Sequence, residues 1–258
     1  MPVHDLELLL DVAGTAGDIA LKYFKNDPET WEKDGDQGPV TVADMEVNAM
    51  LETRLKAARP DYGWLSEETD DDLARLDCDR VFILDPIDGT RSFIMGHENF
   101  AHSFAVAEKG VVTAAVVHLP AKKMTFAATR GGGATLNGEP IAPSNVDDLA
   151  KAEVLAAKPM LNAEHWAGGV PPVKRNFRSS LAYRLALIAN GRFDAMLTFR
   201  PAWEWDVAAG DLICTEVGAA VFDAKGDVPV YNSTGAKIPG MIACAPALRA
   251  PFLKHLAV

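Results

Sequence analysis

The residues best suited to chemistry lie together in residues 81–90, the run Val-Phe-Ile-Leu-Asp-Pro-Ile-Asp-Gly-Thr. Its first four residues are apolar, and three of them are β-branched or aromatic, which predicts a short buried strand that stops at Asp85. The proline that follows cannot donate to a strand ladder, and Gly89 lets the backbone approach a ligand closely. Asp85, Asp88 and Thr90 thus offer two carboxylates and a hydroxyl at the end of this strand. Hard oxygen ligands suit Mg²⁺, which proteins usually share with a substrate phosphate.

Besides a metal site, this run has two other interpretations. Asp-Gly pairs after strands form ordinary turns, in which the aspartate bonds its own backbone and needs no metal. This interpretation stays open for the run taken alone. The haloacid-type phosphatase signature Asp-x-Asp-Gly-Thr places its acids at i and i+2, whereas Asp85 and Asp88 are at i and i+3. The spacing excludes that signature.

Other acidic residues follow or begin predicted elements. A short strand is predicted for the residues just before Glu67 and Glu68, and neighbours on an extended chain point opposite ways. We therefore expect one of the two glutamates to face the site of Asp85. Thr41 and Asp44 have the spacing of a capping box at the start of a helix. Capping alone explains both residues, although an acid in a first turn can also face a site.

Two further helix starts carry polar residues. Asp206 lies near the start of a helix predicted from about 203 to 218, where the helix dipole favours an acid whether or not a metal is bound. Ser179 and Ser180 precede a helix that runs to about 190, and they either cap it or help to bind an anion at its N-terminus. The glycines of residues 131–138 are interpreted as turns between strands, because no GK[ST] sequence or helix follows them. Three nearby histidines are interpreted as structural or surface residues: His97, His102 and His118.

The bulk composition limits the architecture. The chain has 258 residues, 48% apolar and 24% charged, which is enough for one large domain or two closely packed lobes. A weakly patterned stretch at 142–152 predicts a passage between an N-terminal lobe, 1–150, and a C-terminal lobe, 151–258. Predicted strands and helices interleave throughout, which indicates a layered mixed α/β fold.

The composition also restricts the partners and location. Acids interrupt the early leucines and no apolar run is long enough for a membrane span, so neither a signal peptide nor a membrane segment is expected. Three scattered cysteines are too few for a disulfide framework or a zinc site, which favours a reducing cytoplasm. The net charge of −11 argues against binding to a nucleic acid polymer. Residues 67–88 contain nine acids and two arginines, a local balance of −7.

With these residues identified, the chain resembles the inositol monophosphatase superfamily of Mg²⁺-dependent, lithium-sensitive phosphatases over nearly its whole length. The resemblance rests on three motifs in the family's order: Ser66-Glu-Glu-Thr69, Asp85-Pro-Ile-Asp-Gly-Thr90 and Trp205-Asp-Val-Ala-Ala-Gly210. Lys33, the segment Pro39-Val-Thr-Val-Ala-Asp44 and the hairpin of Gly131 to Gly138 also look like the family. Any one of these motifs is moderately specific, and three in order are very specific.

The resemblance implies a layered αβαβα fold and hydrolysis of a small phosphate monoester, such as inositol 1-phosphate, by a metal-activated water. It implies two or three Mg²⁺ ions held by four acids and one backbone carbonyl: Glu67, Asp85, Ile87, Asp88 and Asp206. The catalytic residues would be Asp44 and Thr90, which orient the water, and Glu67, which also holds the third ion. The expected substrate contacts are the amides of Gly89 and Thr90 together with Asp88, Ser179, Ser180 and Asp206.

Departures from the family pattern leave the substrate open. The central motif continues as Thr90-Arg-Ser-Phe-Ile94, and Arg178-Ser-Ser-Leu181 follows later. Both segments look partly like 3′(2′),5′-bisphosphate nucleotidases. The acid that inositol phosphatases place before their Trp-Asp has no clear equivalent, although Glu204 is near. A histidinol-phosphate phosphatase and a regulatory protein on the same scaffold are further alternatives, and the family suggests a homodimer.

Overall fold

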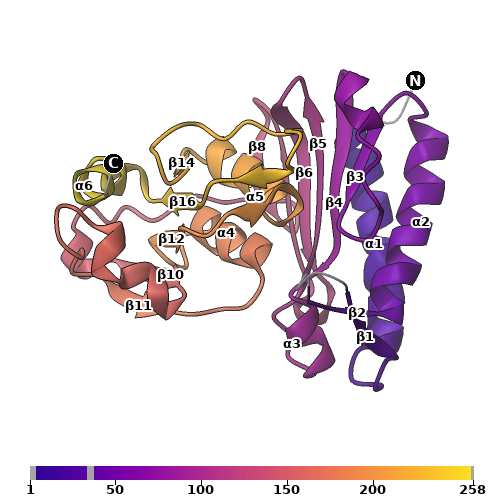
Figure 1. Ribbon diagram of the computed structural model, residues 1–258, viewed down its shortest axis with the longest axis horizontal. Helices are drawn as coiled ribbons and strands as arrows, with labels where there is room; N and C mark the ends of the chain where they lie inside the picture. Colours follow the sequence, from indigo (N-terminus) through magenta and orange to yellow (C-terminus); the bar gives the residue numbers. More distant parts are fainter. Residues whose placement is uncertain (1–3, 34–37, 257–258) are drawn as a thin grey trace.

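Five layers make up the molecule, which a computed structural model describes for residues 4–33 and 38–256. In order they are a helix pair, a large sheet, a second helix pair, a smaller sheet, and an outer layer that contains the last helix (Figure 1). The helices are α1 (Asp5–Tyr23), α2 (Val42–Ala58), α3 (Thr90–Ile94), α4 (Leu181–Ala189), α5 (Glu204–Glu216) and α6 (Arg249–His255). This arrangement confirms the predicted αβαβα sandwich. No helix of the described residues is long and apolar enough to cross a membrane.

The large sheet is built from consecutive strands. Its order follows the sequence: β3 (Gly63–Ser66), β4 (Arg80–Asp88), β5 (Ala101–Glu108), β6 (Val111–Leu119), β7 (Met124–Thr129), β8 (Gly133–Leu136) and β9 (Glu139–Pro140). Only the β3–β4 pair of this sheet is parallel, and the other neighbours are antiparallel. The turn between β5 and β6 places Lys109 and Gly110 at positive φ, which a glycine adopts readily.

The smaller sheet mixes parallel and antiparallel neighbours. Its order is β11 (Lys174–Asn176), β10 (Glu153–Ala156), β12 (Ala195–Thr198), β16 (Met241–Cys244) and β14 (Ala220–Phe222). Two short pairs complete the strands: β1 (Thr30–Glu32) with β2 (Pro39–Thr41), and β13 (Ala202–Trp203) with β15 (Lys237–Ile238). The large sheet lies before residue 150 and the small one after it, but α5 packs on strands of the large sheet. A lobe boundary at residue 150 therefore stays a prediction.

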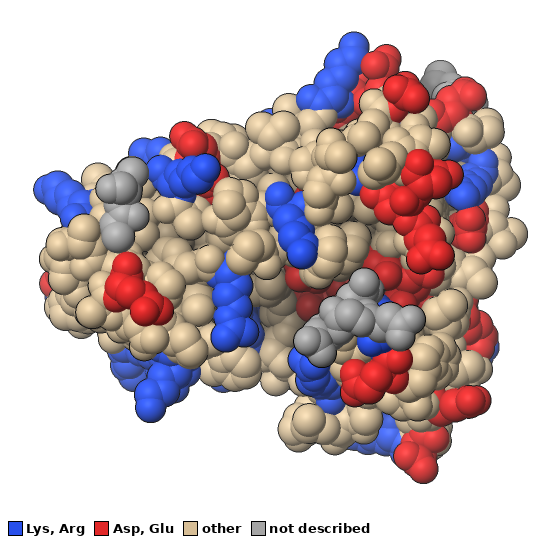
Figure 2. All heavy atoms as spheres, in the orientation of Figure 1, with Lys and Arg blue, Asp and Glu red and all other residues tan. Residues whose placement is uncertain are grey.

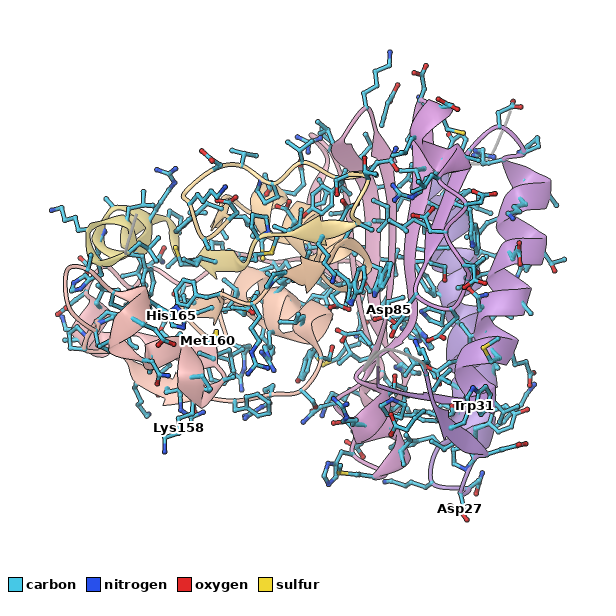
Figure 3. All side chains as sticks on the ribbon, viewed as in Figure 1. Asp27, Trp31, Asp85, Lys158, Met160 and His165 are labelled. Carbon is cyan, nitrogen blue, oxygen red and sulfur yellow. The ribbon has the colours of Figure 1, made fainter. Side chains whose placement is uncertain are left out.

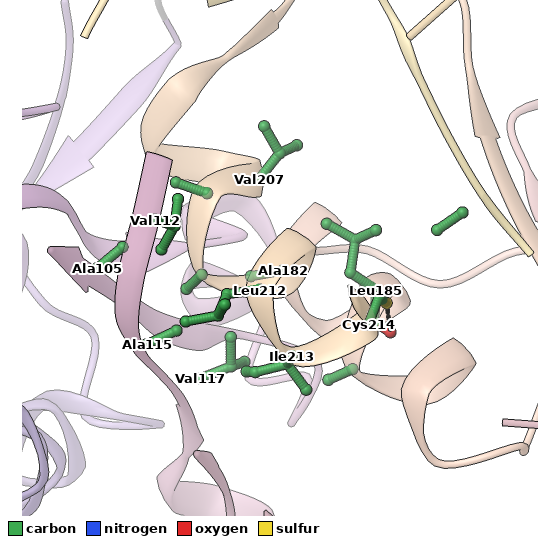
Figure 4. Packing of buried hydrophobic residues seen from close by; sticks show 14 of the residues in the cluster. Ala105, Val112, Ala115, Val117, Ala182, Leu185, Val207, Leu212, Ile213 and Cys214 are labelled. Atoms are coloured by element: carbon green, nitrogen blue, oxygen red, sulfur yellow. Dashed lines mark hydrogen bonds between the residues drawn. The ribbon is translucent and has the colours of Figure 1, made fainter. Parts of the chain in front are cut away.

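Helix α5 is the buried centre of the fold. Nearly all its residues are buried, and Val207, Leu212 and Ile213 belong to the apolar cluster that also holds strands of both sheets (Figure 4). Gly210 lets α4 approach closely, since a Cβ at this position would lie 2.5 Å from the side chain of Leu185. The close packing fixes the first turns of α4 and α5 relative to each other, and these turns carry site residues.

One predicted boundary is wrong. The apolar run was expected to end its strand at Asp85, but β4 continues to Asp88. The ladder with β5 is irregular between Asp85 and Asp88 and resumes at the pair Asp88–Ala101. Pro86 lies within this irregularity, where the ladder does not need its missing N–H. Its carbonyl instead accepts a hydrogen bond from His102 Nδ1.

Candidate metal centre

Three carboxylates meet between the large sheet and helices α4 and α5. Asp85 and Asp88 come from the end of β4, and Asp206 comes from the first turn of α5. One oxygen from each lies within 4.8 Å of the other two. Figure 3 places Asp85 at the junction of the large sheet and the central helices. Local sequence brings the first two acids together, and packing of α5 adds the third.

The electrostatics of this cluster favour a bound cation. Asp85 is 1% exposed, and its Oδ1 has no hydrogen-bond partner among the described residues. Burial and then the neighbouring carboxylates raise the pKa values of Asp85 and Asp206 well above the usual range. Burial also raises the pKa of Asp88, to about 6. A divalent ion would cancel the like charges and satisfy the orphaned oxygen, so these residues fit Mg²⁺.

Asp88 is held in place by the start of α4. Its Oδ2 accepts hydrogen bonds from Ser180 Oγ at 2.6 Å and from Ala182 N at 2.7 Å. Ser180 also caps the helix, since its Oγ accepts from Tyr183 N at 3.0 Å. The hydroxyl of Ser180 is thus already engaged with a carboxylate of the cluster. A contact between Ser180 and a substrate stays a prediction.

Ser179 is engaged in a similar way. Its hydroxyl donates to the carbonyl of Asn99 at 3.0 Å and lies 2.7 Å from Ser92 Oγ. These bonds join the start of α4 to the segment around α3. Ser179 and Ser180 both line the cavity of the metal centre.

Asp44 caps a helix and also contacts Thr90, which lines the cavity, but Asp44 itself is not among the lining residues, so its role in the site stays a prediction. Its Oδ2 accepts from the Thr41 amide at 2.8 Å and from the Thr41 hydroxyl at 2.6 Å, which confirms the capping box. Its Oδ1 lies 3.5 Å from Thr90 Oγ1, which also donates to the carbonyl of Ile87 at 3.0 Å. Burial raises the pKa of Asp44 to about 6.

Glu67 lines the cavity but does not belong to the compact cluster of three. Its Oε1 accepts from Lys33 Nζ at 2.8 Å, and the same ammonium lies 2.7 Å from Glu68 Oε1. Burial and the charge of Glu67 raise the pKa of Glu68 to about 7. Glu67 lines both the cavity of Asp85 and a neighbouring hollow, whereas Glu68 lines the hollow but not the cavity. Lys33 thus binds one oxygen of the glutamate that was predicted to bind metal.

The cavity has a volume of about 470 Å³ and opens between the two sheets. Figure 2 shows a hollow between the two parts of the molecule with acidic side chains in it. Gly89, at φ 96°, lines the cavity beside Thr90, and this left-handed backbone favours glycine. Seven lining residues were not among the predicted site residues: Gly38, Pro39, Arg91, Ser92, Phe177, Arg184 and Trp203. Arg184 could have been found, because it follows Ser180 by one helical turn.

Other sequence interpretations can also be placed. None of the three histidines lines the cavity, and buried His102 has a pKa lowered to about 3 by burial. The amide of Gly132 donates to the Thr129 carbonyl at 2.9 Å in the turn between β7 and β8, which confirms turn chemistry. The amides of Gly131 and Gly133 donate to the carboxylate of Glu216 at 2.9 and 3.0 Å. Glu204 is fully buried and accepts from the amides of residues 232 and 233. It does not line the metal cavity.

Comparisons with known proteins agree with this fold and site. A model described as the inositol monophosphatase family matches residues 4–253. An inositol-1-monophosphatase of Rhizobium meliloti is 34% identical over 72% of this chain and 73% of its own. The Nus factor SuhB of Vibrio cholerae is 30% identical over 97% and 95% of the two chains. A histidinol-phosphatase of Chlorobaculum parvum is 31% identical over 90% of each.

Solved structures show the same architecture. An IMPase of Thermotoga maritima superimposes with a TM-score of 0.83 at 27% identity, over 97% of this chain and 95% of its own. The extragenic suppressor protein SuhB of Bartonella henselae gives a TM-score of 0.81 at 25% identity, over 96% of each chain.

Proposed function

Since the chain belongs to the inositol monophosphatase family, we propose that it is a Mg²⁺-dependent phosphomonoesterase that hydrolyses a small phosphate ester resembling inositol 1-phosphate. The observation that carries this proposal is the cluster of Asp85, Asp88 and Asp206 around an orphaned buried oxygen. Without metal, two charges 4 Å apart at an effective dielectric of 20 repel by about 4 kcal/mol. An anionic substrate therefore needs cations in this site.

Mg²⁺ would be held by the three clustered aspartates, with Glu67 and the carbonyl of Ile87 completing the coordination of two or three ions. When bound, it would neutralise the carboxylates, lower the pKa of a water and stabilise the charge of the transferred phosphoryl group. Glu67 can take part while it keeps its ion pair, because Lys33 engages only its Oε1 and leaves Oε2 for the ion.

The remaining roles belong to groups beside the cluster. The paired Asp44 and Thr90 would orient the attacking water, with the Asp44 carboxylate able to accept its proton. The amides of Gly89 and Thr90 would receive the phosphate, and no side-chain nucleophile is needed.

The first test is phosphate release. We expect release that requires Mg²⁺, falls with Li⁺, and is abolished in Asp85→Asn. A matched control is Asp211→Asn, because Asp211 is also buried but bonds Tyr231 and Thr215 rather than the cluster. An Asp85→Asn enzyme as active as the parent would refute the assignment.

The substrate is the next question. The similarity to an inositol-1-monophosphatase supports inositol 1-phosphate, and the similarity to a histidinol-phosphatase supports histidinol phosphate. The segment 178–181 supports 3′-phosphoadenosine 5′-phosphate as a third candidate. Relative kcat/KM values for these three esters decide among them.

A regulatory protein on the same scaffold is the second candidate, supported by the match to Nus factor SuhB over nearly the whole chain. A pull-down that recovers a stable macromolecular partner, with no phosphate released from any ester, would favour it. A homodimer and a cytoplasmic location are also proposed. Light scattering of the purified protein tests the dimer.

A further inference from the structure

A cation on helix α4 is buried in the wall of the metal cavity. Arg184 is 8% exposed and lines the same cavity as Asp85, Gly89 and Asp206. Its Nε donates to the carbonyl of Arg178, and its Cζ lies 4.7 Å from the centre of the Phe177 ring. Within the described ranges, no carboxylate forms an ion pair with it and no acceptor engages its Nη1 or Nη2.

This guanidinium lacks a close anion. Burial lowers the pKa of Arg184, and the charges of Asp88 and Asp206 oppose that effect. A buried cation needs such compensation, because it has lost most of its hydration. Under the proposed function, the same two aspartates bind Mg²⁺ and their negative charge is cancelled. With metal bound, the Nη groups of Arg184 would have no anionic acceptor in the cavity.

The guanidinium and the proposed phosphate site occupy different parts of the cavity wall. Gly89 packs on Ser180, since a Cβ on that glycine would lie 3.4 Å from Ser180 Cβ. Arg184 lies one helical turn beyond Ser180, and its side chain turns to residues 177–178. The guanidinium is thus held by residues 177–178 and not by the segment of Gly89 and Thr90, an arrangement that suits a group of the substrate other than the scissile phosphate.

The residues around Arg184 favour the binding of an anion next to its guanidinium. Phe177 is 50% exposed and lines the cavity, so it offers a flat apolar surface beside the cation. Arg91, exposed on α3, lines the cavity as well and adds positive charge. A planar guanidinium can bind a carboxylate or a phosphate through two parallel hydrogen bonds.

We propose that Arg184 is a specificity-determining residue that binds a second anionic group of the substrate. The enzyme then prefers phosphate monoesters that carry another phosphate or a carboxylate beside the scissile group. This inference rests on the phosphomonoesterase function proposed above. Of the three candidate substrates it favours 3′-phosphoadenosine 5′-phosphate, because inositol 1-phosphate and histidinol phosphate carry no second anion.

The experiment compares esters that differ only in the second anion. One pair is adenosine 3′,5′-bisphosphate and adenosine 3′-monophosphate, and the other is 2-phosphoglycerate and glycerol 2-phosphate. We expect the parent enzyme to prefer the first member of at least one pair by about 10- to 100-fold in kcat/KM, the range for a charge-assisted hydrogen bond. Whichever pair shows the preference identifies the second anion as a phosphate or a carboxylate.

The variants assign that preference to one side chain. Arg184→Met should abolish it while changing kcat/KM on the esters without a second anionic group by less than about threefold. Arg184→Lys should retain part of it, because a lysine keeps the charge without the planar fork. Arg178→Met is the matched control: its guanidinium donates to the carbonyl of Phe177, lies outside the cavity lining, and should leave the preference intact.

Two outcomes overturn the inference while leaving the phosphatase function standing. One is a parent enzyme that hydrolyses both members of each pair equally, and the other is an Arg184→Met enzyme in which both members fall equally. If the parent protein hydrolyses no ester, the proposed function fails. Calorimetric binding of the same pairs with Mg²⁺ then decides the role of Arg184, and equal affinities in parent and Arg184→Met would refute it.

Discussion

Asp85→Asn should make the metal-free protein more stable while it removes the response to Mg²⁺. Asp85 lies within 4.8 Å of two other carboxylates, a separation at which two unit charges repel by about 3.5 kcal/mol at an effective dielectric of 20. Because the raised pKa values show that protons already relieve part of this repulsion, the expected net gain is about 2 kcal/mol. For a chain of this size, that is roughly 4–8 °C in Tm.

The assay is thermal unfolding at pH 8, with either a chelator or Mg²⁺ present. Mg²⁺ at 100 times its Kd should stabilise the parent by about 2.7 kcal/mol and the variant by far less. Asp211→Asn serves as the control, because its carboxylate is buried but remote from the cluster, and it should keep the full response to Mg²⁺. A metal-free Asp85→Asn protein that melts below the parent, yet still gains stability from Mg²⁺, would contradict a cation site at this cluster.

Three further predictions concern the same site. In the folded protein burial raises the pKa values of Asp44 and Asp88 from the usual 3.8 to about 6, so the stability they contribute without metal is full below about pH 4 and lost as the pH rises through 6. Urea unfolding with a chelator should show a loss of about 3 kcal/mol per carboxylate between pH 4 and 8, and a rise in stability over that range would contradict it. Ser180→Ala removes both a helix cap and a bond to Asp88, and should cost about 1–2 kcal/mol and weaken Mg²⁺ binding in a calorimetric titration. An unchanged Mg²⁺ affinity would show that Asp88 does not need this hydroxyl. Gly89→Ala forces a side chain into φ 96° and to 3.1 Å from the Asn99 carbonyl, so it should cost about 1–3 kcal/mol and reduce kcat. Full activity and an unchanged urea midpoint would argue against a strained turn.

Local sequence predicted most of the elements because their causes lie within a few residues. An apolar run identified β4 and a short strand was correctly predicted before Glu67, and the Thr41–Asp44 capping box identified the start of α2. The glycines at 131–133 were correctly assigned to turns. Asp85 and Asp88 are three residues apart, so their proximity also follows from the sequence. The end of β4 was predicted too early. Pro86 has no N–H and so indicates the end of a strand, but the irregular ladder between β4 and β5 accommodates it.

Family motifs in order predicted the layered fold and the acids that could share a metal, but the pairing of side chains needed the tertiary structure. Asp206 reaches Asp85 only because α5 is buried between the sheets, with Gly210 packed on α4. Contacts between distant segments also decide two other features. They are the ion pair of Lys33 with Glu67 and the position of Arg184 in the cavity wall. Periodicity and capping describe neighbours along the chain, whereas charge pairing and burial depend on distances between segments that only folding brings together.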